Sequence, residues 1–339
     1  MPASEDRSQP PLLTIAIPTY NRAACLSVLL DCISEQVRTM PNIEILISDN
    51  NSSDETQTLV QEKLRDGVPL RYQRNIENIG ADRNFLQCFE LARGKYVWIV
   101  GDDDVIVPGA IAQITRYLLQ DEYDLVYVSS CNFEDVHELT TDPVQATKPI
   151  LITRATDLAR RVHVFFTFIS GNIINKDRVI ASVHPPFVEL ANSNLIQLGW
   201  TYTALRNHRK SLFFEDKLVA AKAGNTGGYG LFRVFGSNLK KVTEDWLGDR
   251  KLVRIILNAT LQSFLPPYIL AMRSSTAHNF AAEDSRVVLG PIYRRRWRYW
   301  VFVYPLSSLP LSVAKIWSYF LRAINKLDRL LGQPLLRFI

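Results

Sequence analysis

The sequence predicts an α/β protein with a doubly wound, mostly parallel sheet that has helices on both faces. Short apolar runs typical of buried strands alternate with amphipathic helical patterns through the first 130 residues. Polar side chains follow directly after several of these runs, as at the ligand-binding edge of an open α/β sheet. A chain of 339 residues with 47% apolar and 22% charged residues is sufficient for such a core.

Each expected element rests on a local pattern. Strands are expected where apolar residues run together, at Leu13–Ile17, Ile43–Ser48, Leu70–Arg74, Tyr96–Val100 and Leu125–Ser129. Helices are expected between them, at Leu26–Val37, Ser52–Leu64, Ala81–Ala92 and from Pro108 to Leu119. Ser52 with Glu55 fits a capping box, and Pro108 suits a first helical turn. Because βαβ units join parallel strands, this alternation predicts a largely parallel sheet.

The pattern is less regular after residue 131. Helices are expected at Thr156–Phe166 and Asn192–Asn207, and strands at Phe168–Ile174 and Ser211–Val219.

Three consecutive carboxylates, Asp102, Asp103 and Asp104, come directly after the buried strand Tyr96–Val100. Three adjacent like charges repel one another, and a hard divalent cation would offset that repulsion. The alternative is a solvated acidic turn that caps the helix opened by Pro108.

Other polar groups follow neighbouring strands, and a parallel sheet would bring them to the same edge. The ring of Tyr20 can stack on a nucleotide base, Asp49 can accept a base N–H, and Arg83 with a metal can neutralise a diphosphate. Each has a structural alternative: packing on the sheet edge for Tyr20, a turn or helix cap for Asp49, and a surface charge for Arg83. In combination they favour a metal and nucleotide site.

Residues 12 to about 130 resemble the family 2 inverting glycosyltransferases, which have the GT-A fold. Five motifs carry the resemblance in that family's order and spacing: Ile17–Arg22, Asp49–Asp54, Asn78–Asn84, Gly94–Tyr96 and Asp102–Pro108. More loosely, the chain resembles bacterial transferases that add sugars, including dideoxyhexoses such as abequose, to lipid-linked O-antigen units.

The resemblance implies which residues bind a nucleotide-diphosphate sugar donor: Pro18, Tyr20, Asp49, Arg83 and Asp102. Tyr20 and Asp49 would contact the base and Asp102 the ribose. Asp103 would hold Mn²⁺ or Mg²⁺ on the diphosphate and so serve catalysis, with Asp104 assisting. Many family members have Asp where this chain has Gly101, so the identity of the direct metal ligand stays open.

Inverting transfer also needs a base that removes the acceptor's proton. The family usually supplies it as Glu-Asp shortly before a helix, where this chain has Ala191–Asn192 ahead of Leu195–Gly199. Glu189 is the nearest substitute and is the predicted base. Asp216 and His184 are alternatives.

The C-terminal segment predicts a different partner. Residues 286–339 contain ten Lys or Arg and one acid, whereas the whole chain has a net charge of +5. Apolar residues of this segment share one face of a predicted helix: Val313, Ile316, Trp317, Phe320, Leu321, Ile324, Leu327 and Leu331. This composition is typical of a helix lying in an anionic membrane surface. The alternative is a helix packed on the catalytic domain, and the acidic remainder of the chain argues against a nucleic-acid partner.

These expectations divide the chain into a disordered tail (1–11), a nucleotide-sugar-binding half (12–130), an acceptor-binding half (131–235) and a helical, basic membrane-surface region (236–339). No secretory signal is recognised at the start, and the four cysteines are expected to be reduced core thiols. The predicted location is cytoplasmic, at the inner face of the plasma membrane.

The predicted function is inverting transfer of a sugar to a lipid-linked saccharide in cell-surface polysaccharide or O-antigen synthesis. Two alternatives remain. One is a catalytically impaired module that binds nucleotide sugar and membrane, since the usual base motif is missing. The other is an aspartyl phosphotransferase, since Asp102 and Asp104 have DxD spacing.

Overall fold

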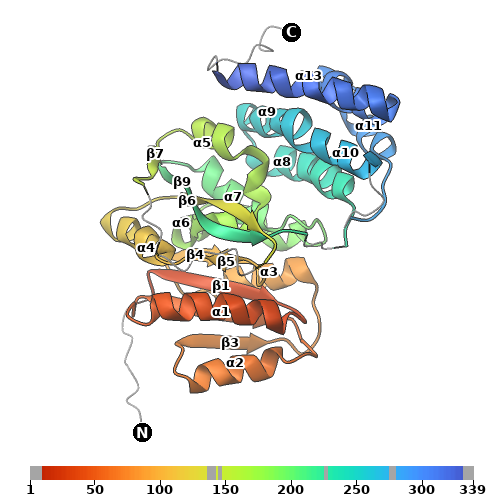
Figure 1. The fold of residues 1–339 in the computed structure, drawn as a ribbon. Coiled ribbons are helices and arrows are strands. Elements are labelled where there is room, and N and C mark those ends of the chain that lie inside the picture. The colour runs from red at the N-terminus through yellow and green to blue at the C-terminus, as the bar shows by residue number, and fades with distance from the viewer. Residues whose placement is uncertain (1–9, 136–142, 144–146, 225–227, 275–279, 331–339) are drawn as a thin grey trace. The chain divides into compact units, whose positions relative to one another are not determined.

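The structure, a computed structural model, describes residues 10–135, 143, 147–224, 228–274 and 280–330. The chain forms two compact units, Met1–Gly224 and Asn225–Ile339 (Figure 1). Most of the tail predicted at 1–11 lies outside the described residues. The boundary predicted at 235/236 falls inside a helical run from 231 to 247, so the structure places the division earlier.

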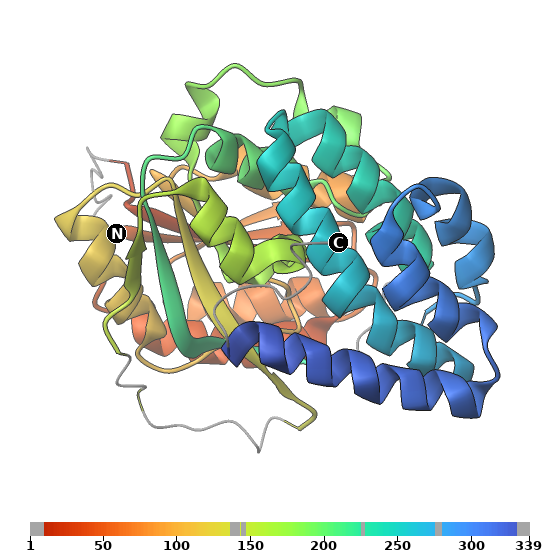
Figure 2. The ribbon, with the colours of Figure 1, turned by 90° about the horizontal axis from the view of Figure 1, so that it is seen from above.

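The first unit is built on a nine-stranded sheet. Its first half is parallel, in the order β3 (Leu70–Arg74), β2 (Ile43–Asp49), β1 (Leu13–Thr19), β4 (Tyr96–Ile99). The second half is mixed and contains β8 (Asn172–Asn175), β6 (Leu125–Phe133), β9 (Ser211–Lys222), β5 (Val105–Ile106) and β7 (Ile150–Ile152). Strand β8 enters antiparallel between β4 and β6, and the long strands β6 and β9 run side by side in parallel (Figure 2).

Helices cover both faces of this sheet, as the sequence predicts. Helix α1 (Ala23–Val37) packs its predicted apolar stripe into one core with α4 (Ala110–Gln120) and Val60 of α2 (Thr56–Arg65). On the other face α3 (Ala81–Leu91) and α7 (Gln197–Arg206) lie over β4 and β8. Shorter segments complete the unit: α5 (Ala155–Val162), the 3-10 turns His163–Thr167, Ile169–Gly171 (η3) and Phe187–Leu190 (η4), and α6 (Lys176–Ile180).

Two predicted helix starts are wrong for local reasons. The capping box at Ser52 does not form, because α2 begins at Thr56 and Asp54 accepts the N–H of that residue at 3.1 Å. The helix expected from Asn192 begins at Gln197, because Asn192 and Asn194 have φ values of 67° and 58°, which a right-handed helix does not allow.

The second unit is helical and has its own core. Its helices are α8 (Leu239–Leu247), α9 (Arg250–Ala259), α10 (Leu265–Ser274), α11 (Ser285–Tyr293), α12 (Tyr304–Ser308) and α13 (Leu311–Leu330), with π-helical turns Arg233–Asn238, Thr260–Phe264 and Tyr299–Val303. Apolar residues from α10, α11, α12, α13 and the π-helical turns pack together in this core. Within the described residues, one continuous helical run, Arg250–Ser274, is long and apolar enough by length and composition to cross a membrane, and 44% of its apolar window is buried.

Candidate functional site

The carboxyl ends of β1, β2 and β4 meet at one edge of the sheet. Thr19 lies opposite Asp49 in the register of β1 and β2. The N–H of Val100 donates to the carbonyl of Ala16 at 2.9 Å, so β4 ends beside β1. The motifs predicted to share an edge therefore do so, and Pro18 lies buried in β1 among them.

Asp102 and Asp103 are held at this edge by Thr19, the last residue of β1, and by Arg22 just after it. Thr19 donates its hydroxyl to Asp102 Oδ2 at 2.8 Å, and Arg22 Nη1 lies 3.2 Å from Asp102 Oδ1 and 2.9 Å from Asp103 Oδ2. Asp102 is 5% exposed, and this burial raises its pKa to about 6 although Arg22 favours the ionised form. Sequence reasoning gave Arg22 and Thr19 no role of their own, because the contact joins residues about eighty positions apart.

Asp104 points into the unit. Ser170 donates its hydroxyl to Asp104 Oδ2 at 2.5 Å and accepts the N–H of Gly101 at 2.9 Å, while the N–H of Lys222 lies 3.3 Å from Asp104 Oδ1. Burial raises the pKa of Asp104 to about 7, against the hydrogen bond from Ser170. Nothing local in the sequence singled out Ser170, which nonetheless fixes the acidic turn.

Asp49 is fully buried and accepts hydrogen bonds from residues that follow it in the sequence. The N–H of Ser52 donates to Oδ1 at 2.8 Å, the hydroxyl of Tyr72 donates to Oδ2 at 2.5 Å, and Arg74 Nε lies 3.5 Å from Oδ2. The turn that the sequence left as an alternative is thus present, and contact with a base stays a prediction.

Tyr20 and Arg83 have exposed side chains near the carboxyl ends of the parallel strands. Tyr20 is 44% exposed. Arg83 is exposed on the first turn of α3 and makes no hydrogen bond or ion pair with the described residues. The turn before Arg83 is fixed to β2, because Asn50 accepts the N–H of Ile79 at 2.9 Å and donates to Asn78 at 2.7 Å.

The three candidate bases differ in their surroundings. Glu189 is exposed on η4, which packs on α3 through an edge contact of Phe187 with Phe89 at 5.5 Å. Asp216 accepts both the N–H and the hydroxyl of Thr147 at 2.7 Å, which gives it a structural role. The ring of His184 stacks on Phe187 at 4.3 Å.

The acidic turn suits a divalent cation shared with a ligand. The described residues contain no group of three acidic, histidine or cysteine side chains placed to enclose a metal. Mg²⁺ is commonly bound by one or two carboxylates together with substrate phosphates, so a closed cage is not required. Asp102 and Asp103 both reach one cationic atom, Arg22 Nη1, and the space between their carboxylates therefore accommodates positive charge.

Comparison with known proteins agrees with this geometry. The chain matches the sequence profile of glycosyl transferase family 2 over residues 14–179. Over 180 residues it is 33% identical to abequosyltransferase RfbV of Salmonella typhimurium, covering 49% of this chain and 54% of that protein. Over 108 residues it is 32% identical to GalNAc(5)-diNAcBac-PP-undecaprenol beta-1,3-glucosyltransferase of Campylobacter jejuni, covering 31% of this chain and 34% of that protein. The matches thus span about half of one relative and a third of the other.

Solved structures show the same fold. TarS 1–349 of S. aureus in complex with UDP-GlcNAc superposes with a TM-score of 0.60 at 16% identity, covering 95% of this chain and 92% of that one. Mannosyltransferase PcManGT from Pyrobaculum calidifontis in complex with GDP-Man and Mn²⁺ gives 0.52 at 15% identity, covering 96% and 90%. The expected GT-A fold is confirmed, together with the helical C-terminal part.

Proposed function

We propose that this protein transfers a sugar from a nucleoside-diphosphate donor to a saccharide acceptor with inversion at the anomeric carbon. The observation that carries the proposal is the acidic turn after β4, where Asp102 and Asp103 face Arg22 beside the exposed ring of Tyr20. Two structural neighbours support this donor class, since they were solved in complex with UDP-GlcNAc and with GDP-Man.

The residues at the edge divide the chemistry between them. Tyr20 stacks on the base, Asp49 accepts a base N–H, Asp102 holds the ribose, and Asp103 provides the metal ligand with Asp104 behind it. A bound Mn²⁺ or Mg²⁺ would neutralise charge on the departing diphosphate. Arg83, exposed on α3, adds positive charge on the same side.

Glu189 is the proposed base that removes the proton from the saccharide acceptor. Glu189 is exposed and has no partner among the described residues, so its carboxylate is free to accept the proton of an attacking hydroxyl. One relative is named for a saccharide on undecaprenol diphosphate, which supports an acceptor of that class. We infer a lipid-linked saccharide acceptor at the cytoplasmic face of a membrane.

The experiment compares Asp103→Asn with Asp66→Asn, an exposed acid after α2. Nucleotide sugars are screened by calorimetry with Mn²⁺, Mg²⁺ or EDTA. We expect metal-dependent binding of the nucleotide sugar to weaken at least about tenfold in Asp103→Asn, because changes around a metal site commonly lower metal affinity by that factor. Binding by Asp66→Asn should be unchanged. Equal binding by both variants would contradict the assignment of Asp103.

Transfer is measured separately on the wild type and Glu189→Gln. Loss of transfer with retained donor binding in Glu189→Gln supports this base, and normal transfer refutes it. Metal-dependent donor binding by the wild type without transfer to any saccharide would favour the catalytically impaired module.

A further inference from the structure

Asp82, in the first turn of α3, carries a buried carboxylate that nothing in the proposed chemistry uses. The residue is only 7% exposed, and its Oδ2 accepts the N–H of Asn194 at 3.0 Å across a large sequence separation. The backbone of Asn192, Ser193 and Ile196 also favours the ionised form of this carboxylate. The segment before α7 is thus joined to this single buried side chain.

The backbone of that segment is shaped to bind an anion. Asn192 and Asn194 both have positive φ, and a backbone that alternates in this way directs successive N–H groups to one side. Helix α7 begins directly afterwards at Gln197, and the amino end of a helix also favours negative charge. Burial raises the pKa of Asp82, and the backbone of residues 192–196 opposes this effect.

The segment held by Asp82 connects the two sides of the proposed reaction. It follows Glu189, the proposed base, by a few residues, and Asp82 itself precedes Arg83, the proposed diphosphate contact. Further along α3, Phe89 makes an edge contact with Phe187 at 5.5 Å and stacks on Trp200 at 4.8 Å. Aromatic packing therefore holds the segment 187–196 against one end of α3, and the Asp82 carboxylate holds it by a hydrogen bond at the other end.

We propose that Asp82 is a positioning residue that holds the segment 187–196, and Glu189 with it, against the donor-binding side of α3. The inference rests on the proposed function. It assigns Asp82 no contact with substrate, so its removal should affect transfer far more than donor binding. The aromatic contacts of Phe89 remain without it, and they keep the segment attached to α3.

The test uses the full chain with Asp82→Ala, Asp82→Asn and, as control, Glu90→Gln, an exposed acid on the same helix. Hydrogen exchange measures protection of the amides of residues 192–196, calorimetry measures donor binding, and turnover measures transfer. In Asp82→Ala we expect the amides to exchange at least tenfold faster and donor affinity to stay within about twofold. The kcat for transfer should fall about ten- to a hundredfold, because a small misplacement of a reacting group lowers the rate by that order.

Asp82→Asn keeps one acceptor oxygen without the charge, and it should fall between the wild type and Asp82→Ala in both exchange and kcat. Unchanged amide exchange in Asp82→Ala would overturn the inference, and so would normal transfer despite faster exchange. A wild type that binds no nucleotide sugar would instead contradict the proposed function. Amide exchange would still show whether Asp82 holds residues 192–196 in place.

Discussion

Buried carboxylates in this protein differ in what their surroundings do to them. Asp102 and Asp104 lie at the edge of the sheet with few donors, and burial raises the pKa of each. Glu44, inside β2, is 7% exposed, yet its pKa is lowered. Burial opposes ionisation there as well, but Thr14 Oγ1, Arg71 Nε and the N–H of Arg93 donate to Glu44 at 2.6, 2.9 and 3.1 Å. At Glu44 these three hydrogen bonds and the charge of Arg71 together outweigh the effect of burial.

Glu44→Gln should therefore lower stability in a pH-dependent way. Because the pKa is lower in the folded than in the unfolded protein, the ionised carboxylate stabilises the fold above the unfolded pKa of about 4.3, and this contribution is lost as pH falls through the folded pKa. We expect the free energy of unfolding to fall by about 1–3 kcal/mol at pH 7. Urea unfolding at pH 7 and at successively lower pH measures the difference.

The control is Glu62→Gln, an exposed acid on α2, which should have little effect at any pH. A loss in Glu44→Gln that is the same at every pH would show that lost packing, rather than charge, explains it.

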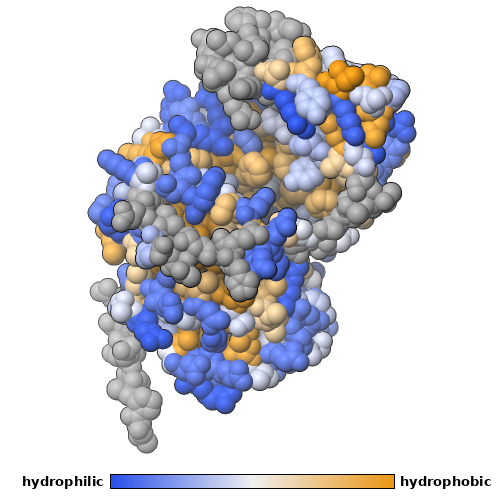
Figure 3. All heavy atoms as spheres, in the orientation of Figure 1, coloured by the Kyte–Doolittle hydropathy of each residue, from blue (hydrophilic) through white to orange (hydrophobic). Residues whose placement is uncertain are grey.

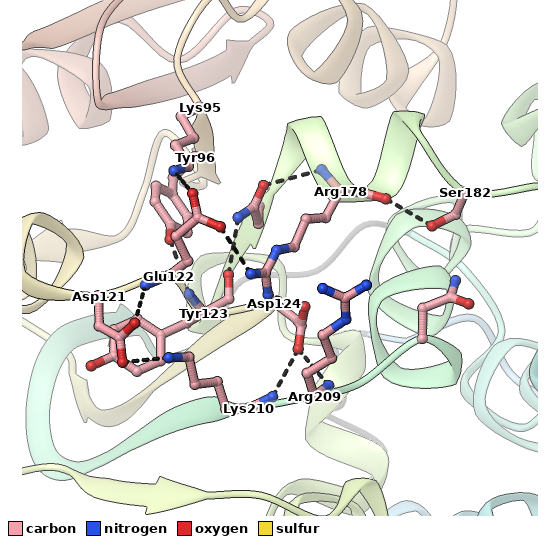
Figure 4. A network of polar contacts seen from close by, with 12 residues as sticks. Lys95, Tyr96, Asp121, Glu122, Tyr123, Asp124, Arg178, Ser182, Arg209 and Lys210 are labelled. Carbon is pink, nitrogen blue, oxygen red and sulfur yellow. Dashed lines mark hydrogen bonds and ion pairs between the residues drawn. The ribbon is translucent and has the colours of Figure 1, made fainter.

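At the scale of elements, polar contacts join strands at the edge opposite the site. Asp124, just before β6, accepts from Arg178 Nη1 at 2.6 Å and from the N–H groups of Arg209 and Lys210 at 2.6 and 2.9 Å (Figure 4). These donors lie in α6, which follows β8, and just before β9. One buried carboxylate thus links three elements that the sequence does not place together. Glu122 binds the same arginine at 2.9 Å, but its side chain is 50% exposed.

The two acids give a matched comparison. Asp124→Asn removes a buried charge that neutralises Arg178, and we expect it to cost about 3 kcal/mol or more in unfolding free energy. Glu122→Gln removes an exposed partner and should cost under about 1 kcal/mol. Neither should change donor affinity, because this edge is remote from the acidic turn. Equal losses in urea unfolding would contradict the importance assigned to burial.

At the scale of the whole molecule, the two units carry different functions. The first holds the complete proposed donor site. In the second, α13 buries part of its predicted apolar face, since Trp317 and Leu321 pack into the core. The rest is uncovered within that unit: Ile316 is 70% and Phe320 53% exposed, and Figure 3 shows apolar residues over part of α13. One side of α13 thus packs on the core of its own unit, and membrane contact by the other side stays a prediction.

We propose that the exposed side of α13 contacts an anionic membrane surface, since Lys315 and Arg322 are exposed on the adjoining side. Ile316→Ser with Phe320→Ser should weaken binding to vesicles that contain anionic lipid by about tenfold or more, because apolar burial is lost. Cosedimentation measures this, and higher salt should reduce wild-type binding.

Val183→Ser is the control, since Val183 is 94% exposed in the first unit. Equal binding to vesicles of neutral lipid, or no loss in the double variant, would count against a membrane role for this helix.

Several expectations failed where the deciding contacts are not local. Cys131, expected in the core, is exposed on β6, although Phe133 two residues further along the strand is buried. Strand β8 pairs antiparallel with its neighbours, although its composition resembles that of a parallel strand. Composition reports how buried a strand is, whereas its direction depends on the path of the chain on either side.

The sequence by itself determined the parallel half of the sheet and the edge that carries Tyr20, Asp49 and the three acids. Local periodicity specifies those strands, and parallel order then aligns their ends. Only the tertiary structure decided which groups hold the edge in place. The contacts of Ser170 with Asp104, Arg22 with Asp102, and Asp82 with the segment before α7 join residues from 66 to 112 positions apart. Such pairs leave no periodic signal, because a hydrogen bond depends on where the folded chain returns and not on the spacing of its residues.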